Sequence, residues 1–105
     1  MLSLFRVKGE SMEPWAREGD FVLAERMSYL FSRPRIGHLV VVRHPQKHDM
    51  LLLKRIVQEY EGMYWIEGDN TPKSIDSRRF GLLKRGLVLG KVIHKTGPCG
   101  RSIMS

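Results

Sequence analysis

The sequence predicts a mainly β fold in a single small domain. Short runs rich in β-branched and other apolar residues recur along the chain, and clusters of glycine, proline, asparagine and aspartate separate them, as in strands joined by turns. A chain of 105 residues has room for one hydrophobic core. We expect a folded domain over residues 1–94 and a flexible tail over residues 95–105, which hold two glycines, a proline and little apolar material.

Six segments have the composition and alternation of strands: residues 2–8, 20–25, 39–43, 50–59, 64–67 and 86–94. The second has an apolar centre with charged ends, the third is rich in valine, and the fourth is apolar on both faces. The turn at residues 60–63 should fold the fourth and fifth into a hairpin. Gly90 marks a bulge or a close backbone approach in the last strand.

The segments between these strands are interpreted as turns and loops. Residues 10–18 contain Pro14 and should form a turn or a single helical turn. Residues 26–35 are irregular but hold Tyr29, Leu30 and Phe31. A loop this apolar either packs as a flap on the core or contacts a partner.

The positive charge of the chain leaves two interpretations open. Its formal net charge is +7, and a basic excess often indicates nucleic acid or an anionic membrane as a partner. Lysine and arginine are scattered, however, with no run of five or more. The densest cluster, residues 78–85, lacks the aromatic-rich pattern of an RNA-binding sheet. We expect a solvated basic surface and no nucleic-acid partner, and a non-enzymatic basic binding module remains an alternative.

Composition also limits the location and the cofactors. The longest apolar runs are about four residues, whereas a membrane span needs about 20, and no signal peptide is recognisable. Cys99 is the only cysteine, so no disulfide can form within the chain. We expect a soluble, cytoplasmic protein, or a membrane-associated one if an anchor has been removed. The four histidines and Cys99 lack ligand spacing, so we expect no metal and no cofactor.

Ser11 is the candidate nucleophile. It lies between a glycine and a proline in the segment Gly9-Glu10-Ser11-Met12-Glu13-Pro14. A serine hydroxyl needs a proton acceptor before it becomes a useful nucleophile. The rest of the chain must therefore supply a base, a site for the oxyanion and a groove for a peptide.

Lys54 is the preferred base. Strand alternation places it on one face with Met50, Leu52 and Ile56, and burial among apolar side chains lowers the pKa of a lysine and favours the neutral amine. Ser-Lys dyads are a known variant of the serine triad. Two other roles for Lys54 stay open, because its amine could reach water or pair with an acid.

The histidines are weaker candidates for the base. His44 and His48 lie in a polar turn and are expected to be solvated. His38 and His94 stand at the start and the end of strands, and neither is flanked by an obvious orienting carboxylate.

The polar segment over residues 68–81 is expected to be a structured loop that returns toward the strand of Lys54. Asp76 and Arg78 can pair there, and asparagine and aspartate side chains can bond to backbone amides. The hydroxyl of Ser74 could hydrogen-bond the amine of Lys54.

These stretches together resemble the signal peptidase I family of serine proteases. The matching elements are Gly-x-Ser-Met-x-Pro followed by Gly-Asp, then Lys-Arg after an apolar strand, then Gly-Asp-Asn…Ser-x-Asp-Ser-Arg-x-Phe-Gly. The resemblance implies that Ser11 is the nucleophile and Lys54 the general base, with Ser74, Asp76 and Arg78 in support. It also implies a partly open β-barrel, shared in outline with self-cleaving repressors of the LexA type.

The sequence differs from the family pattern in two respects and is most similar to one subgroup of the family. Family members carry membrane anchors, which we do not expect in this chain, and some place an oxyanion-donating serine where this chain has Gly9. We expect the Ser11 backbone N–H to serve as an oxyanion donor, with Gly9 and Met12 at substrate-binding positions. The middle of the chain is most similar to the soluble maturation proteases of nickel-type superoxide dismutase.

The implied function is that of a serine endopeptidase that removes an N-terminal extension from a precursor protein, bound as an extended peptide. Nickel superoxide dismutase maturation is the specific form expected, and any nickel would belong to the substrate. A signal peptidase catalytic domain that lacks its anchor is the first alternative. A LexA-type domain is disfavoured, because there is no room for its DNA-binding helices and scissile linker.

Overall fold

The computed structural model describes residues 2–70 and 75–96 of the chain. Its elements, in order, are β1 (Leu2–Arg6), β2 (Phe21–Glu25), α1 (Ser28–Phe31), β3 (Leu39–Arg43), β4 (Leu51–Tyr60), β5 (Met63–Glu67), α2 (Ser77–Phe80), β6 (Leu83–Lys84), the 3₁₀ turn η2 (Arg85–Leu87) and β7 (Val88–Thr96). The mainly β fold is confirmed. The two α-helices each span only four residues.

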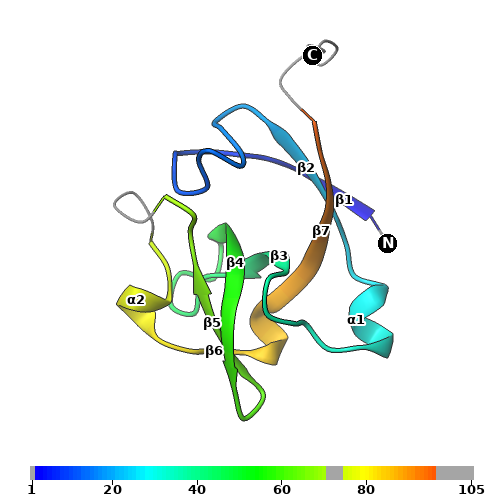
Figure 1. Cartoon of the computed structure of the whole chain (residues 1–105), viewed down its shortest axis with the longest axis vertical. Helices are drawn as coiled ribbons and strands as arrows, with labels where there is room; N and C mark the ends of the chain where they lie inside the picture. Colours follow the sequence, from blue (N-terminus) through cyan, green and yellow to red (C-terminus); the bar gives the residue numbers. More distant parts are fainter. Residues whose placement is uncertain (1, 71–74, 97–105) are drawn as a thin grey trace.

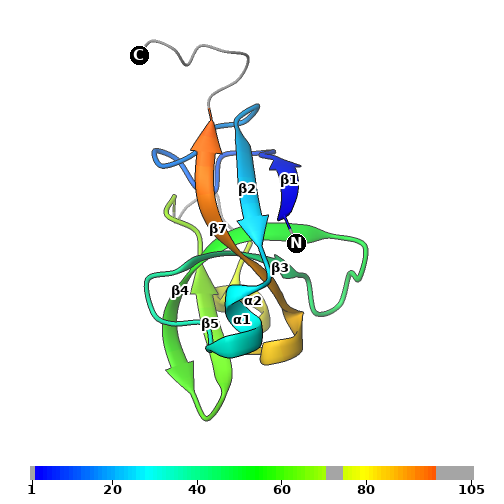
Figure 2. The ribbon, with the colours of Figure 1, turned by 90° about the vertical axis from the view of Figure 1, so that its right-hand side faces the viewer.

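The seven strands form one antiparallel sheet in the order β1-β2-β7-β3-β4-β5-β6. The sheet curls into a half-barrel, with β1 and β6 at its two edges. Figure 2 shows β7 running beside β2 at one end and continuing toward β3 at the other. This long strand joins the part of the sheet near the N-terminus to the part built by β3, β4 and β5.

Two clusters of buried side chains hold the curled sheet together. The first contains Tyr29, Val40, Val42, Ile56, Tyr64, Ile66, Leu83 and Val88. The second contains Val7, Met12, Ala16 and Val22, with Leu39 and Leu53 packed against it. Consecutive residues of a strand point to opposite faces, so β4 contributes to both clusters. The prediction that this strand is apolar on both faces is confirmed.

Two backbone details predicted from glycines are also found. The β4–β5 hairpin turns through Glu61 and Gly62, whose φ angles are +50° and +82°, as in the two-residue turns that match strand twist. The ladder between β3 and β7 shifts register beside Gly90. A Cβ atom on Gly90 would lie 3.2 Å from the carbonyl oxygen of Glu25, so the two backbones approach closely here and a side chain would have to displace that carbonyl by a few tenths of an ångström.

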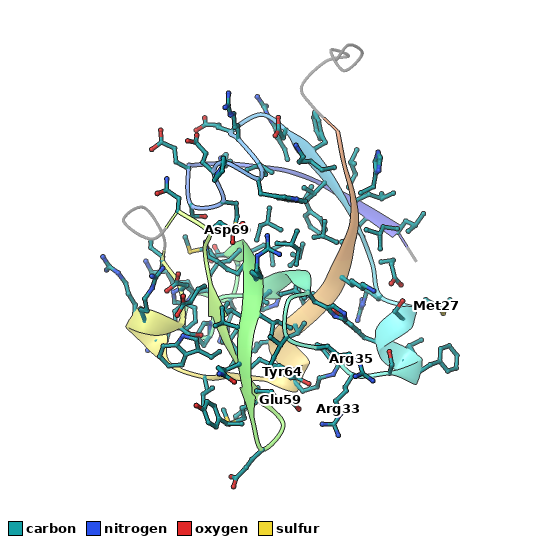
Figure 3. All side chains as sticks on the ribbon, viewed as in Figure 1. Met27, Arg33, Arg35, Glu59, Tyr64 and Asp69 are labelled. Atoms are coloured by element: carbon teal, nitrogen blue, oxygen red, sulfur yellow. The ribbon has the colours of Figure 1, made fainter. Side chains whose placement is uncertain are left out.

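The loop over residues 26–35 differs from a flap packed on the core. Tyr29 is buried in the first cluster, but Leu30 and Phe31 are 74% and 85% exposed. Met27 also points outward from α1 in Figure 3. A single turn of helix has only one inward face, and Tyr29 occupies it.

The observed ends of the strands differ from the predicted ends by a few residues. The last strand reaches Thr96, beyond the predicted limit of 94, and residues 97–105 lie outside the described part. β6 pairs with β5. Among residues 2–70 and 75–96, no helix is long and apolar enough to cross a membrane.

Candidate active site

Ser11 lies in the loop between β1 and β2. Hydrogen bonds from Val7 N to Asp20 O and from Gly19 N to Val7 O, of 2.8 and 2.9 Å, close this loop at its base. Gly9 has a φ of +79°, a value that glycine adopts without strain. The loop leaves Ser11 half-buried, so its hydroxyl can meet both a base and a substrate.

Lys54 reaches Ser11 from β4. It pairs with Val40 of β3, shares a face with Ile56, and is only 2% exposed. Its Nζ lies 2.8 Å from the Oγ of Ser11, within hydrogen-bond distance. The two residues stand 43 positions apart in the chain, and the curl of the sheet brings them together.

Burial lowers the pKa of Lys54 from 10.5 to about 8. Asp76 acts in the opposite direction and raises this pKa, whereas Arg78 lowers it. An amine with this pKa is neutral in about a tenth of the molecules at pH 7. In the neutral form its lone pair can accept the proton of the Ser11 hydroxyl.

Asp76 and Arg78 form an ion pair in which the carboxylate is buried and the guanidinium is partly exposed. Asp76 is fully buried, and Arg78 donates to both of its carboxylate oxygens at 3.0 and 2.6 Å. Asp76 also accepts from the backbone N–H of Arg78 at the start of α2 and from Gly68 N at 2.9 Å. The predicted pairing is therefore present. The guanidinium offsets the carboxylate charge that would otherwise hold Lys54 protonated.

The turn formed by Gly68, Asp69 and Asn70 connects the predicted motifs. Asp69 N donates to the Sδ of Met12 at 3.4 Å, and Asn70 N donates to the carbonyl of Ser11 at 2.7 Å. The side-chain amide of Asn70 donates to the carbonyl of Glu10 at 2.9 Å.

This turn is itself held from two directions. Arg55, the neighbour of Lys54, donates to both carboxylate oxygens of Asp69 at 3.0 and 2.9 Å. Gly68 is held by the buried Asp76. Figure 3 shows Asp69 beyond the end of β5, facing the loop that carries Ser11. Gly68, Asp69 and Asn70 belong to a motif that the sequence shows, but their contact with the serine loop was not predicted from it.

The side chain of Met12 does not lie where the sequence predicted it. Met12 was expected at a substrate-binding position, but its side chain is 1% exposed and packs in the second cluster. That expectation is wrong for the side chain, because a buried thioether offers no surface to a peptide. Ser74 lies outside the described residues.

None of the histidines in the described part of the chain takes the place of Lys54, and His44 lies in an environment that differs from the predicted one. His44 was expected to be solvated, yet it is buried, with Nδ1 accepting from the backbone N–H groups of Gln46 and Lys47 and its ring edge against Phe80. His38 hydrogen-bonds to Tyr29. In the described part of the chain no histidine is bonded to Ser11.

A groove of about 160 Å³ opens beside Ser11 and Lys54. Residues 5–8 line one side and residues 51–54 the other, and Val22 and Val41 complete the lining. β1 pairs only with β2, and β5 pairs with β4 only from Arg55 onward. Both walls therefore carry strand segments without a partner on one edge, among the described strands.

Comparison with known proteins places the chain in a family. The family model described as "Signal peptidase, peptidase S26" matches residues 1–58 and 60–96. The chain is 31% identical over 121 residues to the mitochondrial ATP-independent inner membrane protease subunit 1a of Arabidopsis thaliana, with 93% of this chain and 72% of the relative covered.

Two further relatives agree. The mitochondrial inner membrane protease subunit 1 of Mus musculus is 30% identical, with 86% of this chain and 66% of the relative covered. The mitochondrial inner membrane protease subunit 2 of Schizosaccharomyces pombe is 30% identical, with 97% and 68% covered. The chain thus spans about two thirds of the length of these relatives. It belongs to the signal peptidase family, peptidase S26, and is a serine peptidase of the signal peptidase I type.

Proposed function

We propose that the chain is a serine endopeptidase that removes an N-terminal extension from a precursor protein, with Ser11 as nucleophile and Lys54 as general base. The observation that carries the proposal is the 2.8 Å approach of Lys54 Nζ to Ser11 Oγ at a lysine whose pKa burial lowers to about 8. A hydroxyl and an amine with these properties are the two groups that a Ser-Lys dyad needs.

The reaction proceeds through an acyl-enzyme. Ser11 Oγ attacks the scissile carbonyl carbon while its proton passes to Lys54 Nζ, and the oxyanion that forms accepts a hydrogen bond from the Ser11 N–H. When the C–N bond breaks, the ammonium of Lys54 protonates the leaving amine. The neutral amine of Lys54 then takes a proton from a water molecule, which attacks the ester carbonyl. The ester C–O bond breaks, and Lys54 returns the proton to Ser11 Oγ, which restores the hydroxyl.

The groove supports an extended substrate. A peptide laid between β1 and the segment at residues 51–54 would meet unpartnered strand edges on both sides, the arrangement used in β-strand addition. Phe5, Val22, Val41 and Leu53 make the lining largely apolar, which favours apolar side chains next to the scissile bond.

Two classes of precursor protein are candidate substrates, and a different observation supports each. A nickel superoxide dismutase precursor is supported by the resemblance of Arg43-His44-Pro45, residues 51–55 and residues 76–81 to that subgroup of proteases. Precursors presented at a membrane are supported by the relatives, whose names describe inner membrane proteases. Those names also favour a membrane-associated location over the cytoplasmic one expected from composition.

The test uses purified chain and mass spectrometry of new N-termini. A nickel superoxide dismutase proprotein and a signal-bearing preprotein in detergent are incubated separately with the wild type, Ser11→Ala and Lys54→Ala. We expect cleavage by the wild type and none by either variant. Lys84→Ala, at an exposed lysine of β6, serves as the matched control and should cleave normally. Full activity of Lys54→Ala would disprove the dyad.

A further inference from the structure

The peptide unit between Glu10 and Ser11 carries the N–H that the proposed mechanism assigns to the oxyanion. A trans peptide is planar, with its carbonyl and its N–H pointing in opposite directions. Whatever fixes the Glu10 carbonyl therefore fixes the direction of the Ser11 N–H. No acceptor for this N–H is found in the described part of the chain.

Asn70 holds this peptide unit from the far side. Its side-chain amide donates to the Glu10 carbonyl at 2.9 Å, and its backbone N–H donates to the Ser11 carbonyl at 2.7 Å. The Glu10 carbonyl also accepts from Glu13 N at 3.1 Å. Because only the NH₂ group of the amide can donate to a carbonyl, the contact also fixes which way the Asn70 amide faces.

We propose that Asn70 is a positioning residue for catalysis, which aims and polarises the Ser11 N–H toward the oxyanion. The inference rests on the proposed function of Ser11. A hydrogen bond to the carbonyl of a peptide draws electron density from its nitrogen and strengthens the N–H as a donor. The stabilisation is greatest when negative charge develops on the substrate oxygen, so it acts in the transition state more than in the bound substrate.

The geometry separates this role from simple support of the loop. Any replacement of Asn70 except proline keeps the backbone bond to the Ser11 carbonyl. The preceding residue, Asp69, stays anchored by the bidentate contact with Arg55. Asn70→Ala therefore removes the bond to the Glu10 carbonyl and leaves the other contacts of the turn in place. Asn70→Asp keeps the shape of the side chain but replaces the donating NH₂ group with a carboxylate oxygen, which cannot donate to the Glu10 carbonyl and repels it.

The experiment measures kcat and KM separately. A randomised, fluorescence-quenched decapeptide library identifies one peptide that the wild type cleaves, and this peptide is then used with Asn70→Ala, Asn70→Asp and Ser11→Ala. The matched control is Gln58→Ala, which removes an amide from an exposed position of β4. Melting temperatures and the ¹H–¹⁵N signal of the Ser11 amide are recorded for each folded variant.

We expect Asn70→Ala to lower kcat about tenfold, less than the loss of a whole oxyanion donor, with KM and the midpoint of the pH–rate profile unchanged. Asn70→Asp should lose at least as much, and the Ser11 amide proton should move upfield in Asn70→Ala but not in Gln58→Ala. A wild-type kcat in both Asn70 variants, or a loss confined to KM, would overturn the inference alone. Normal cleavage by Ser11→Ala, or no cleavage by the wild type, would instead count against the proposed function.

Discussion

The pH dependence of cleavage follows from the pKa of Lys54. Only the neutral amine can take the proton of Ser11, and burial lowers its pKa from 10.5 to about 8. Below that value kcat/KM should rise about tenfold per pH unit, and it should level off above it. At pH 7 the neutral fraction is about a tenth, roughly 300 times the fraction of a lysine with the unperturbed pKa. Burial of Lys54 thus provides enough neutral amine for cleavage near neutral pH.

The assay is kcat/KM for one quenched peptide from pH 5.5 to pH 10.5 at constant ionic strength. Circular dichroism at each pH confirms that the chain stays folded over the range. A profile that keeps rising to pH 10 would show a lysine with an ordinary pKa. A midpoint between pH 6 and pH 7 would instead point to a histidine as the base. Either result would refute the assignment of a desolvated Lys54.

Three further predictions concern stability, each measured by urea unfolding. Lys54→Met should raise the free energy of unfolding at pH 7 by up to about 3 kcal/mol, because folding lowers the pKa of this lysine from 10.5 to about 8. The destabilisation by the buried lysine is complete below pH 8 and absent above pH 10.5. The stability gained by the substitution should therefore vanish above pH 10.5. Asp76→Ala should cost about 1–3 kcal/mol because it leaves the buried N–H of Gly68 without its acceptor, whereas Arg33→Ala, in an exposed pair, should cost less than about 1 kcal/mol. Gly90→Ala should cost about 1–3 kcal/mol because its Cβ would crowd a backbone carbonyl, and Gly86→Ala, with nothing within 4 Å, should be nearly neutral.

The local parts of the fold could be predicted from the sequence because strand geometry is local. Side chains alternate along a strand, so the pattern from residue 50 to residue 59 predicted that Lys54 shares a face with Ile56. The glycine at residue 62 predicted the hairpin for a similar reason, since its backbone can adopt a positive φ. Burial of single side chains was harder to predict. His44 was expected in water and Met12 at the substrate, but Phe80 of α2 packs on the first and Asp69 contacts the second.

The contacts made by Asn70 show the same limit within the site. The residue stands in a turn-forming segment, and nothing in its neighbours predicts that its amide reaches Glu10, 60 positions earlier. The arrangement depends on Arg55 holding Asp69, 14 positions away, and on Asp76 holding Gly68, 8 positions away.

The sequence alone determined the strands, the faces of their side chains and the family resemblance, because these depend on short stretches of chain. Only the tertiary structure decided that Lys54 Nζ lies 2.8 Å from Ser11 Oγ and that Asn70 holds the serine loop. The physical reason is the curl of the sheet. It brings β4 against the loop between β1 and β2 and excludes water from the lysine, and both the distance and the lowered pKa depend on that closure.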